Sequence, residues 1–133
     1  MITVIPPVPS LTDEYFWAAA RESRLVARRC ANCGALQHPP TPMCPHCQSL
    51  DFTVADLSGR GVIYSWIVSR HPSVPESDSR IVALIDLEEG IRMVSNIAAE
   101  PGTQVRTGMP VKVTFTRFGD VTLPQFILDE EAA

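Results

Sequence analysis

The sequence predicts a mainly β protein that begins with one helix, continues with a cysteine-containing ribbon and ends in a small barrel of five strands. Three observations support this fold class. Residues 10–23 read SLTDEYFWAAARES and combine capping residues with alanines, as a helix does. Four cysteines form two Cys-x-x-Cys pairs within residues 30–47. After residue 60, short segments with apolar alternation are separated by turn residues.

We expect three parts along the 133 residues: an N-terminal arm and helix over 1–24, a metal-binding ribbon over 25–56 and a barrel over 57–133. The arm, residues 1–10, contains three prolines that stiffen it. Ser10 or Thr12 can cap the helix that follows, and Asp13 and Glu14 suit its positive N-terminal end.

Three aromatic residues follow one another in this helix, and they cannot all face one core. A helical wheel places Tyr15 with Leu11, Ala18, Ala19 and Val26 on one face, puts Trp17 on the opposite face and leaves Phe16 to the side. Either the ribbon or the arm covers Trp17, or the aromatics dock on another protein. Under the second hypothesis, the partner-docking residues are Tyr15, Phe16 and Trp17.

Five barrel strands are expected at residues 61–70, 80–88, 91–98, 109–118 and 121–128. The fourth alternates most regularly, because Val111, Val113 and Phe115 fall on one face while polar residues fall on the other. Residues 50–61 (LDFTVADLSGRG), which precede the strand segments, are interpreted as a spacer, and the proline-rich residues 71–76 as a surface loop. Five short strands with few helical segments predict a closed barrel of the OB type.

The two cysteine pairs predict a metal site. Cys30, Cys33, Cys44 and Cys47 offer four thiolates from two tight turns, which suits tetrahedral zinc. Four sulfurs leave no open position for water or substrate, so the expected zinc is structural. Iron is the less favoured alternative, because thiolate ligands do not exclude it. His46 lies between two of the cysteines, and we expect it to face solvent.

Net charge and segment hydropathy limit the classes of function. The chain carries 11 basic and 15 acidic residues, and residues 59–133 hold seven cations against ten acids. An acidic barrel is a poor receptor for nucleic-acid phosphates, although OB barrels can bind single strands. The N-terminal residues do not have the pattern of a signal peptide, and no segment is long and apolar enough for a membrane span. We therefore expect a cytoplasmic location, where paired cysteines favour metal over disulfide.

Several stretches together resemble the DUF35 family of zinc-ribbon OB-fold proteins, from about residue 12 to 128. They are FWAAARESRLVARRCANCGALQHPPTPMCPHCQS, LSGRGVIYSW, RIVALIDLEEGIRM and GMPVKVTF. The resemblance implies a non-catalytic accessory subunit that scaffolds a thiolase-like enzyme and helps to bind acyl-CoA in a hetero-oligomer. Its partner would be a thiolase or an acyl-CoA retro-aldolase that shortens sterol side chains. A single-stranded nucleic-acid-binding module is the alternative function.

The sequence offers candidate ligand-binding residues and no catalytic constellation of the Ser/His/Asp or Cys/His kind. Arg24, Arg28 and Arg29 could bind CoA phosphates, or they could be solvated charges near the end of the helix. Tyr64 and Trp66 are expected on one face of a strand, where they could stack on a ligand or fill the core. Whether the chain takes part in catalysis is left open, and the partner is expected to carry the chemistry.

Overall fold

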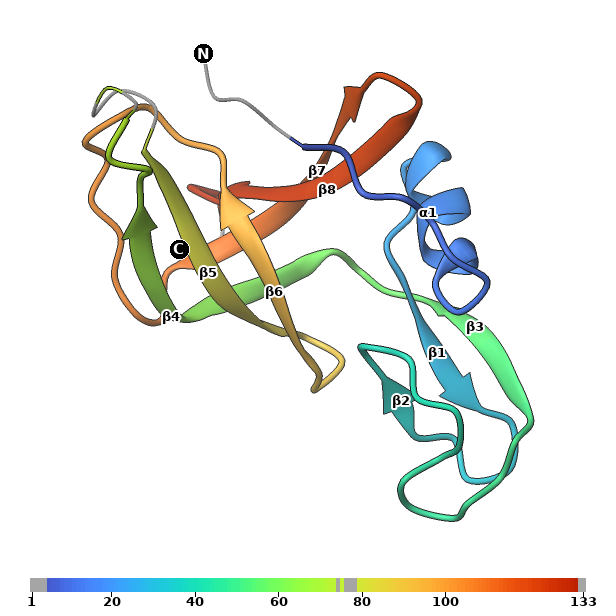
Figure 1. The fold of residues 1–133 in the computed structure, drawn as a ribbon. Helices are drawn as coiled ribbons and strands as arrows, with labels where there is room; N and C mark the ends of the chain where they lie inside the picture. Colours follow the sequence, from blue (N-terminus) through green and yellow to red (C-terminus); the bar gives the residue numbers. More distant parts are fainter. Residues whose placement is uncertain (1–4, 74, 76–78, 132–133) are drawn as a thin grey trace.

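The computed structural model describes residues 5–73, 75 and 79–131, so parts of the predicted arm and of the loop 71–76 lie outside the described residues. The fold class is confirmed: the described chain is mainly β, with one N-terminal helix, a cysteine ribbon and a closed barrel (Figure 1). The elements are α1 (Glu14–Arg21), β1 (Val26–Cys30), β2 (Leu36–Gln37), β3 (Phe52–Asp56), β4 (Arg60–Ser69), β5 (Arg80–Leu87), β6 (Arg92–Ile97), β7 (Pro110–Phe118) and β8 (Val121–Leu128).

Helix α1 is shorter than expected, and only Ala19 of the face grouped by the helical wheel is buried within it. Asp13 is the N-cap, and its carboxylate accepts hydrogen bonds from the backbone and hydroxyl of Ser10. The helix ends when Ser23 adopts a left-handed φ of 58°. Leu11 therefore lies before the helix and is exposed, and Val26 begins a strand. Phe16, with Ala19 and Ala20, forms the buried face instead.

The ribbon contains a three-stranded antiparallel sheet in the order β2-β1-β3. β1 pairs with β3 along its whole length, from Val26 opposite Asp56 to Cys30 opposite Phe52. The interpretation of residues 50–61 as a spacer was therefore wrong for residues 52–56, which form β3. The strand was missed because β3 is short and only Ala55 is buried, so its apolar residues Phe52 and Val54 do not mark a buried face.

The barrel strands follow the predicted segments to within two residues at each end. Their order around the barrel is β4-β5-β6-β8-β7, and β4 closes on β7 through residues 60–62 and 110–112. Neighbouring strands are antiparallel except β6 and β8, which run parallel and share the pair Ile97 and Phe126. Gly61 lies where β4 crosses close to β5, and an added Cβ there would clash with the backbone carbonyl of Asp86.

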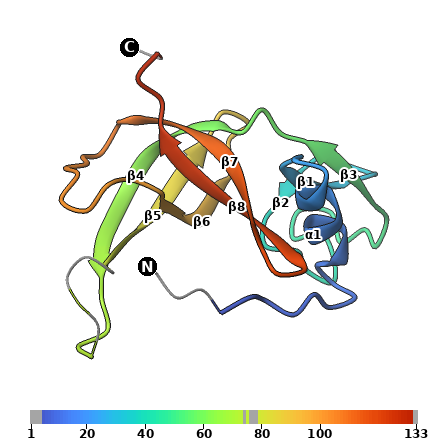
Figure 2. The same cartoon turned by 90° about the horizontal axis from the view of Figure 1, so that it is seen from above.

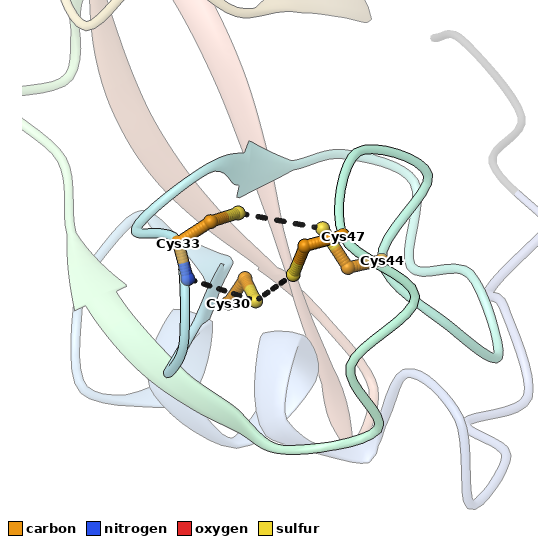
Figure 3. Close-up of side chains that lie close together, drawn as sticks. All are labelled: Cys30, Cys33, Cys44 and Cys47. Carbon is orange, nitrogen blue, oxygen red and sulfur yellow. Dashed lines mark hydrogen bonds between the residues drawn. The ribbon is translucent and has the colours of Figure 1, made fainter.

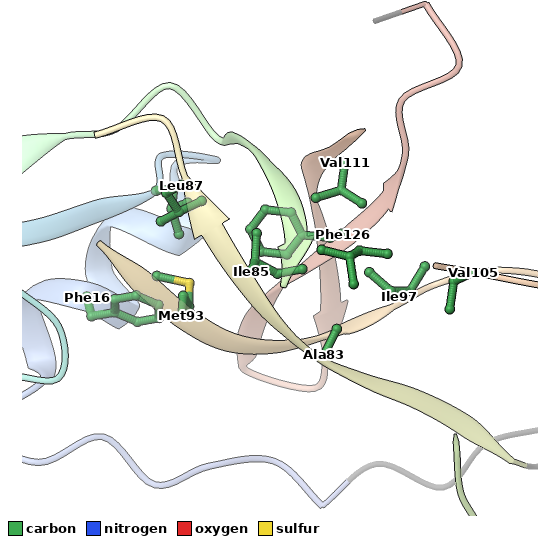
Figure 4. Packing of buried hydrophobic residues seen from close by; sticks show 11 residues of the cluster. Phe16, Ala83, Ile85, Leu87, Met93, Ile97, Val105, Val111 and Phe126 are labelled. Atoms are coloured by element: carbon green, nitrogen blue, oxygen red, sulfur yellow. The ribbon is translucent and has the colours of Figure 1, made fainter. Parts of the chain in front are cut away.

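The core is continuous from the helix into the barrel. Phe16 of α1 lies beside Met93 of β6, and Phe126 is completely buried among the barrel strands (Figure 4). Seen from above, the helix and ribbon lie to one side of the barrel, and the β7–β8 hairpin extends toward the helix (Figure 2). Burial of Phe16 joins the two halves, since a large aromatic ring removes much apolar surface from water.

Within the described residues, no helix has the length and apolar character needed to cross a membrane.

Candidate functional site

The four cysteines meet at the end of the ribbon where Cys30 lies opposite Phe52, the first residue of β3. Cys30 ends β1, and the other three lie in the turns that follow (Figure 3). The Sγ atoms of Cys30 and Cys47 are 3.5 Å apart, those of Cys33 and Cys44 are 3.6 Å apart, and all four lie within 4.8 Å of one another. These distances are far longer than the ~2 Å of a disulfide, and all four are free thiols.

The two pairs are held by matching backbone turns. In the first, the N–H of Gly34 donates to the carbonyl of Cys30 at 2.9 Å, and in the second the N–H of Gln48 donates to the carbonyl of Cys44 at the same distance. Gly34 has a φ of 80° and Gln48 a φ of 60°. A left-handed residue four positions after the first cysteine therefore closes each turn, although only the first turn uses glycine.

Backbone N–H groups directed at sulfur favour the thiolate form. The N–H of Cys33 lies 3.4 Å from Cys30 Sγ, and this contact, with further donors, lowers the pKa of the Cys30 thiol to about 6. In the second turn, the N–H of Cys47 lowers the pKa of Cys44 in the same way. For Cys33, the N–H of Ala35 also acts to lower the pKa, but burial and the neighbouring sulfurs raise that pKa to about 12.

The close approach of the four sulfurs indicates that the site is built for a cation. Four adjacent sulfurs cannot all ionise without a positive charge between them. A tetrahedral ion with metal–sulfur bonds of ~2.3 Å would separate its ligands by about 3.8 Å, close to the 3.5 and 3.6 Å observed. The four cysteines are therefore arranged to bind one metal ion. His46 is exposed and lies outside this set of ligands, as expected.

The three arginines predicted to bind CoA phosphates do not form one cluster. Arg24 donates two hydrogen bonds to the carboxylate of Asp56, at 3.0 and 2.8 Å, and this partner raises the Arg24 pKa. Arg28 stacks 3.7 Å above the ring of Phe52. Arg29 is exposed on the other face of β1, because neighbouring residues of a strand point in opposite directions.

Tyr64 and Trp66 do not share a face of β4, which corrects the expectation from the sequence. The register between β4 and β5 shifts between Ile63 and Ser65, as in a β-bulge. Tyr64 therefore lies on the outer face, where the guanidinium of Arg92 stacks 3.6 Å above its ring. Trp66 pairs with Ala83, whose side chain is buried, so its ring lies on the inner side.

The aromatic residues of α1 are largely covered by the chain itself. Phe16 is 9% exposed, contacts the ring of Trp17 edge-on at 5.0 Å and lies 5.4 Å from that of His38. Tyr15 and Trp17 are half-buried and pack against the core. A groove of about 490 Å³ lies between Trp17, the arm and the β7–β8 turn.

The sequence did not reveal a large cleft beside the barrel. It measures about 1240 Å³ and lies between the ends of β4 and β5, residues 98–105 and the β7–β8 hairpin. Of the residues predicted to bind ligand, it includes only Trp66. Arg70 and Arg80 also line it, and they bracket the proline-rich loop in the sequence. The positions of Arg70 and Arg80 on either side of this loop were visible in the sequence. They indicate a site only once β4 and β5 are known to pair and bring the two arginines to the same cleft.

Two family models match consecutive parts of the chain. Residues 17–53 match the model described as "ChsH2, rubredoxin-like zinc ribbon domain", and residues 54–116 match "ChsH2, C-terminal OB-fold domain". A "DUF35 domain-containing scaffold protein" from Methanocaldococcus jannaschii is 34% identical over 96 residues, which are 70% of this chain and 68% of the relative. The chain belongs to the DUF35 family. The similarity predicted from the sequence motifs is thereby confirmed.

Other relatives of this DUF35 chain are described as enzyme subunits. A "probable enoyl-CoA hydratase alpha subunit" from Thermomonospora curvata is 41% identical over 90% of this chain, which spans only 39% of that protein. "Benzoylsuccinyl-CoA thiolase subunit BbsA" from Thauera aromatica is 31% identical over 65% of this chain and 60% of its own length. A solved structure described as "Ltp2-ChsH2(DUF35) aldolase" matches with a TM-score of 0.84 and 38% identity, over 92% of this chain and 98% of the other.

Proposed function

We propose that this DUF35 chain is a non-catalytic accessory subunit that scaffolds a thiolase-like enzyme and helps it to bind acyl-CoA. The observation that carries the proposal is the likeness, over 92% of the chain, to the chain solved as part of an aldolase described as Ltp2-ChsH2(DUF35). BbsA, which is described as a thiolase subunit, supports the same kind of assembly. The partner would carry out thiolase or retro-aldolase chemistry, with a sterol side chain as one candidate acyl group. We place this hetero-oligomer in the cytoplasm.

The metal in this proposal is zinc, held by Cys30, Cys33, Cys44 and Cys47. Zinc accepts four thiolates in a tetrahedron without redox change, and a site with four protein ligands leaves no position for substrate. Its contribution would be folding energy for the ribbon. Metal analysis of purified protein separates zinc from iron, because an iron–sulfur centre absorbs visible light and a zinc centre does not.

Co-expression with a thiolase-like protein encoded beside this chain tests the scaffold role. Affinity capture of either subunit should recover the other, and acyl-CoA cleavage or condensation should require both. The thiolase-like protein alone and this chain alone are the controls. The proposal fails if the two elute separately, or if the thiolase-like protein is fully active alone.

The partner-docking role of α1 can be tested in the same assay. Because Phe16 is buried in the core of this chain, Phe16→Ala would reduce its stability as well as any docking. Trp17→Ala is the sharper variant, since Trp17 lines the groove next to the arm. We expect weaker capture of the partner by Trp17→Ala, with the fold retained. Unchanged capture would exclude Trp17 from the interface.

A single-stranded nucleic-acid function remains the alternative that an OB-type barrel permits. Such binders combine a basic groove with stacking aromatics, whereas Arg24 and Arg92 here are paired with Asp56 and Asp86. Gel retardation of a single-stranded oligonucleotide at physiological salt distinguishes the two functions. Tight binding there, without capture of a thiolase-like protein, would favour the alternative.

A further inference from the structure

The large cleft beside the barrel lies where OB barrels commonly bind their ligands. Its walls come from the ends of β4 and β5, which flank the first barrel loop, and from the ends of β7 and β8, which flank the last. These two loops border the ligand site in many OB folds. We call it the barrel cleft and define it by Trp66, Val68, Arg70, Arg80, Ile97 and Leu123.

The cleft has an apolar wall that other parts of the described chain leave uncovered. Trp66 is 40% exposed and Val68 is 61% exposed, although both lie on the inner side of β4. Ile97 and Val105, which are buried, lie deeper in the same cleft. Large exposed apolar side chains that converge on one hollow typically mark a binding site.

The described charges of the cleft are opposite in sign to those of the whole chain. Arg70 and Arg80 lie at its edge with one carboxylate, Glu100, so its charged lining is net positive in a protein of net charge −4. Both arginines already interact within the chain. A guanidinium has five N–H donors, so it can keep one partner and still contact phosphate.

Side-chain amides are the third chemical component. Asn96, Gln104 and Gln125 all line the cleft, and amides can pair with amide or hydroxyl groups of a ligand. The cleft therefore offers apolar surface, amides and guanidinium groups together. At about 1240 Å³ it exceeds the 300–1,000 Å³ of ordinary small-molecule pockets, so it can take a long ligand.

We propose that the barrel cleft binds the acyl chain and pantetheine arm of an acyl-CoA, with its phosphates beside Arg70 and Arg80. This inference rests on the proposed function and gives it a location. It also moves the ligand site away from Arg24, Arg28 and Arg29, since none of them lines the cleft. The acyl chain would cover Trp66 and Val68, and the two amides of the pantetheine arm would meet the side-chain amides.

A pair of neighbouring residues provides a matched test. Val68 lines the cleft and is 61% exposed, whereas Ile67 is 62% exposed and points to the opposite face of the same strand. Glutamate at either position would meet solvent to a similar degree. Val68→Glu places a negative charge against the proposed ligand, and Ile67→Glu places the same charge outside the cleft.

Trp66 serves as the reporter in a Trp17→Phe background, because the chain has only these two tryptophans. Decanoyl-CoA should shift the Trp66 emission to the blue as the acyl chain covers the ring. Val68→Glu should weaken this binding at least tenfold, and Ile67→Glu should leave it within about twofold. Arg70→Gln should weaken it by about tenfold, as expected for a lost charged hydrogen bond.

Free CoA and decanoate separate the two ends of the ligand. We expect decanoyl-CoA to bind more tightly than either, because both the apolar wall and the arginines are then used. Decanoate binding as tightly as decanoyl-CoA would overturn the assignment of the phosphates. No emission shift, or equal losses in Val68→Glu and Ile67→Glu, would overturn the cleft as the site.

Capture of the thiolase-like protein by the same variants keeps this proposal distinct from the scaffold role. If Val68→Glu still captures the partner but no longer binds decanoyl-CoA, both proposals stand. If the partner is captured while decanoyl-CoA binding is unaffected by Val68→Glu, only the cleft assignment fails. If no partner is captured but the cleft variants behave as expected, only the scaffold role fails.

Discussion

Apart from Leu25 and Gln37, the buried side chains of the ribbon are small, whereas most of those of the barrel are large. The ribbon buries Val26, Ala27, Cys30, Cys44 and Ala55, and the barrel buries Ile63, Ile85, Met93, Val111 and Phe126. Side chains of the first kind remove too little apolar surface to offset the entropy of ordering about thirty residues. A small module of this kind is usually stabilised by a metal or by disulfides, while five strands around a large-residue core can be stable by hydrophobic burial.

Buried polar atoms show the same difference between the two regions. Among the described residues, Arg28 Nε, Gln37 Nε2 and His38 Nδ1 of the ribbon are buried without a hydrogen-bond partner in the chain, whereas the barrel has only Glu89 Oε1. Each such atom costs free energy unless water reaches it. The ribbon is therefore less stabilised by its own packing and hydrogen bonds than the barrel is, and its stability depends more on metal binding by the four cysteines.

The largest effect should follow removal of the metal. Cys44→Ser, or a strong chelator, would remove a metal contribution of order 10 kcal/mol to the folding of the ribbon. We expect hydrogen exchange to lose protection in β1, β2 and β3 while β4–β8 keep theirs. Equal loss of protection in both regions would show that the barrel depends on the ribbon and would break the comparison.

A substitution in the barrel core should produce the reverse pattern. Phe126 is completely buried, so Phe126→Ala should cost about 3–5 kcal/mol in free energy of unfolding, measured by urea denaturation. Metal stoichiometry should remain unchanged. Val94→Ala is the matched control, because Val94 is 66% exposed, and we expect a change below about 0.5 kcal/mol. A metal content that fell in Phe126→Ala would contradict the independence of the ribbon.

The two cysteine turns permit a finer test, because the same φ region is occupied by glycine in one and glutamine in the other. Gly34→Ala should destabilise the ribbon by about 1–2 kcal/mol, since alanine is strained at a φ of 80°. Nothing lies within 4 Å of the added Cβ, so the cost is conformational. Gln48→Gly should be neutral or stabilising by up to about 1 kcal/mol. Competition with a metal-binding dye measures the metal affinity of both variants. Equal losses of affinity in Gly34→Ala and Gln48→Gly would contradict this account.

The smallest effect concerns pH at the junction of the two regions. Burial beside Phe16 lowers the pKa of His38, so the folded state favours the neutral ring. The contribution of His38 to the free energy of unfolding is complete above the unfolded pKa of about 6.5. It is lost as pH falls toward the lower folded pKa. Between pH 7.5 and 5.5, wild type should lose more stability than His38→Phe, by at most about 1.4 kcal/mol per pH unit. Acid loss at the metal site is common to both proteins and cancels. Parallel pH curves would show that His38 does not titrate across the transition.

Strong local patterns in the sequence were sufficient for the barrel strands and for the metal ligands. Alternation of Val111, Val113 and Phe115 locates β7 without knowledge of its neighbours, because strand geometry repeats every two residues. Cys30, Cys33, Cys44 and Cys47 identify themselves by spacing, since a tight turn brings each pair to one ion. These features are short-range, so the sequence by itself determined the mainly β class, the five barrel strands and the four-sulfur site.

Features that depend on distant partners were decided only by the tertiary structure. The bulge between Ile63 and Ser65 sends Tyr64 outward and Trp66 inward, and no local signal in β4 marks that register shift. β3 forms a strand because it pairs with β1. Phe16 is buried because it packs against core residues of the barrel. The barrel cleft exists only once Arg70 and Arg80 are brought together across strands that pair over eight residues. Burial and cavity shape are properties of packed elements, which no single segment of the chain contains.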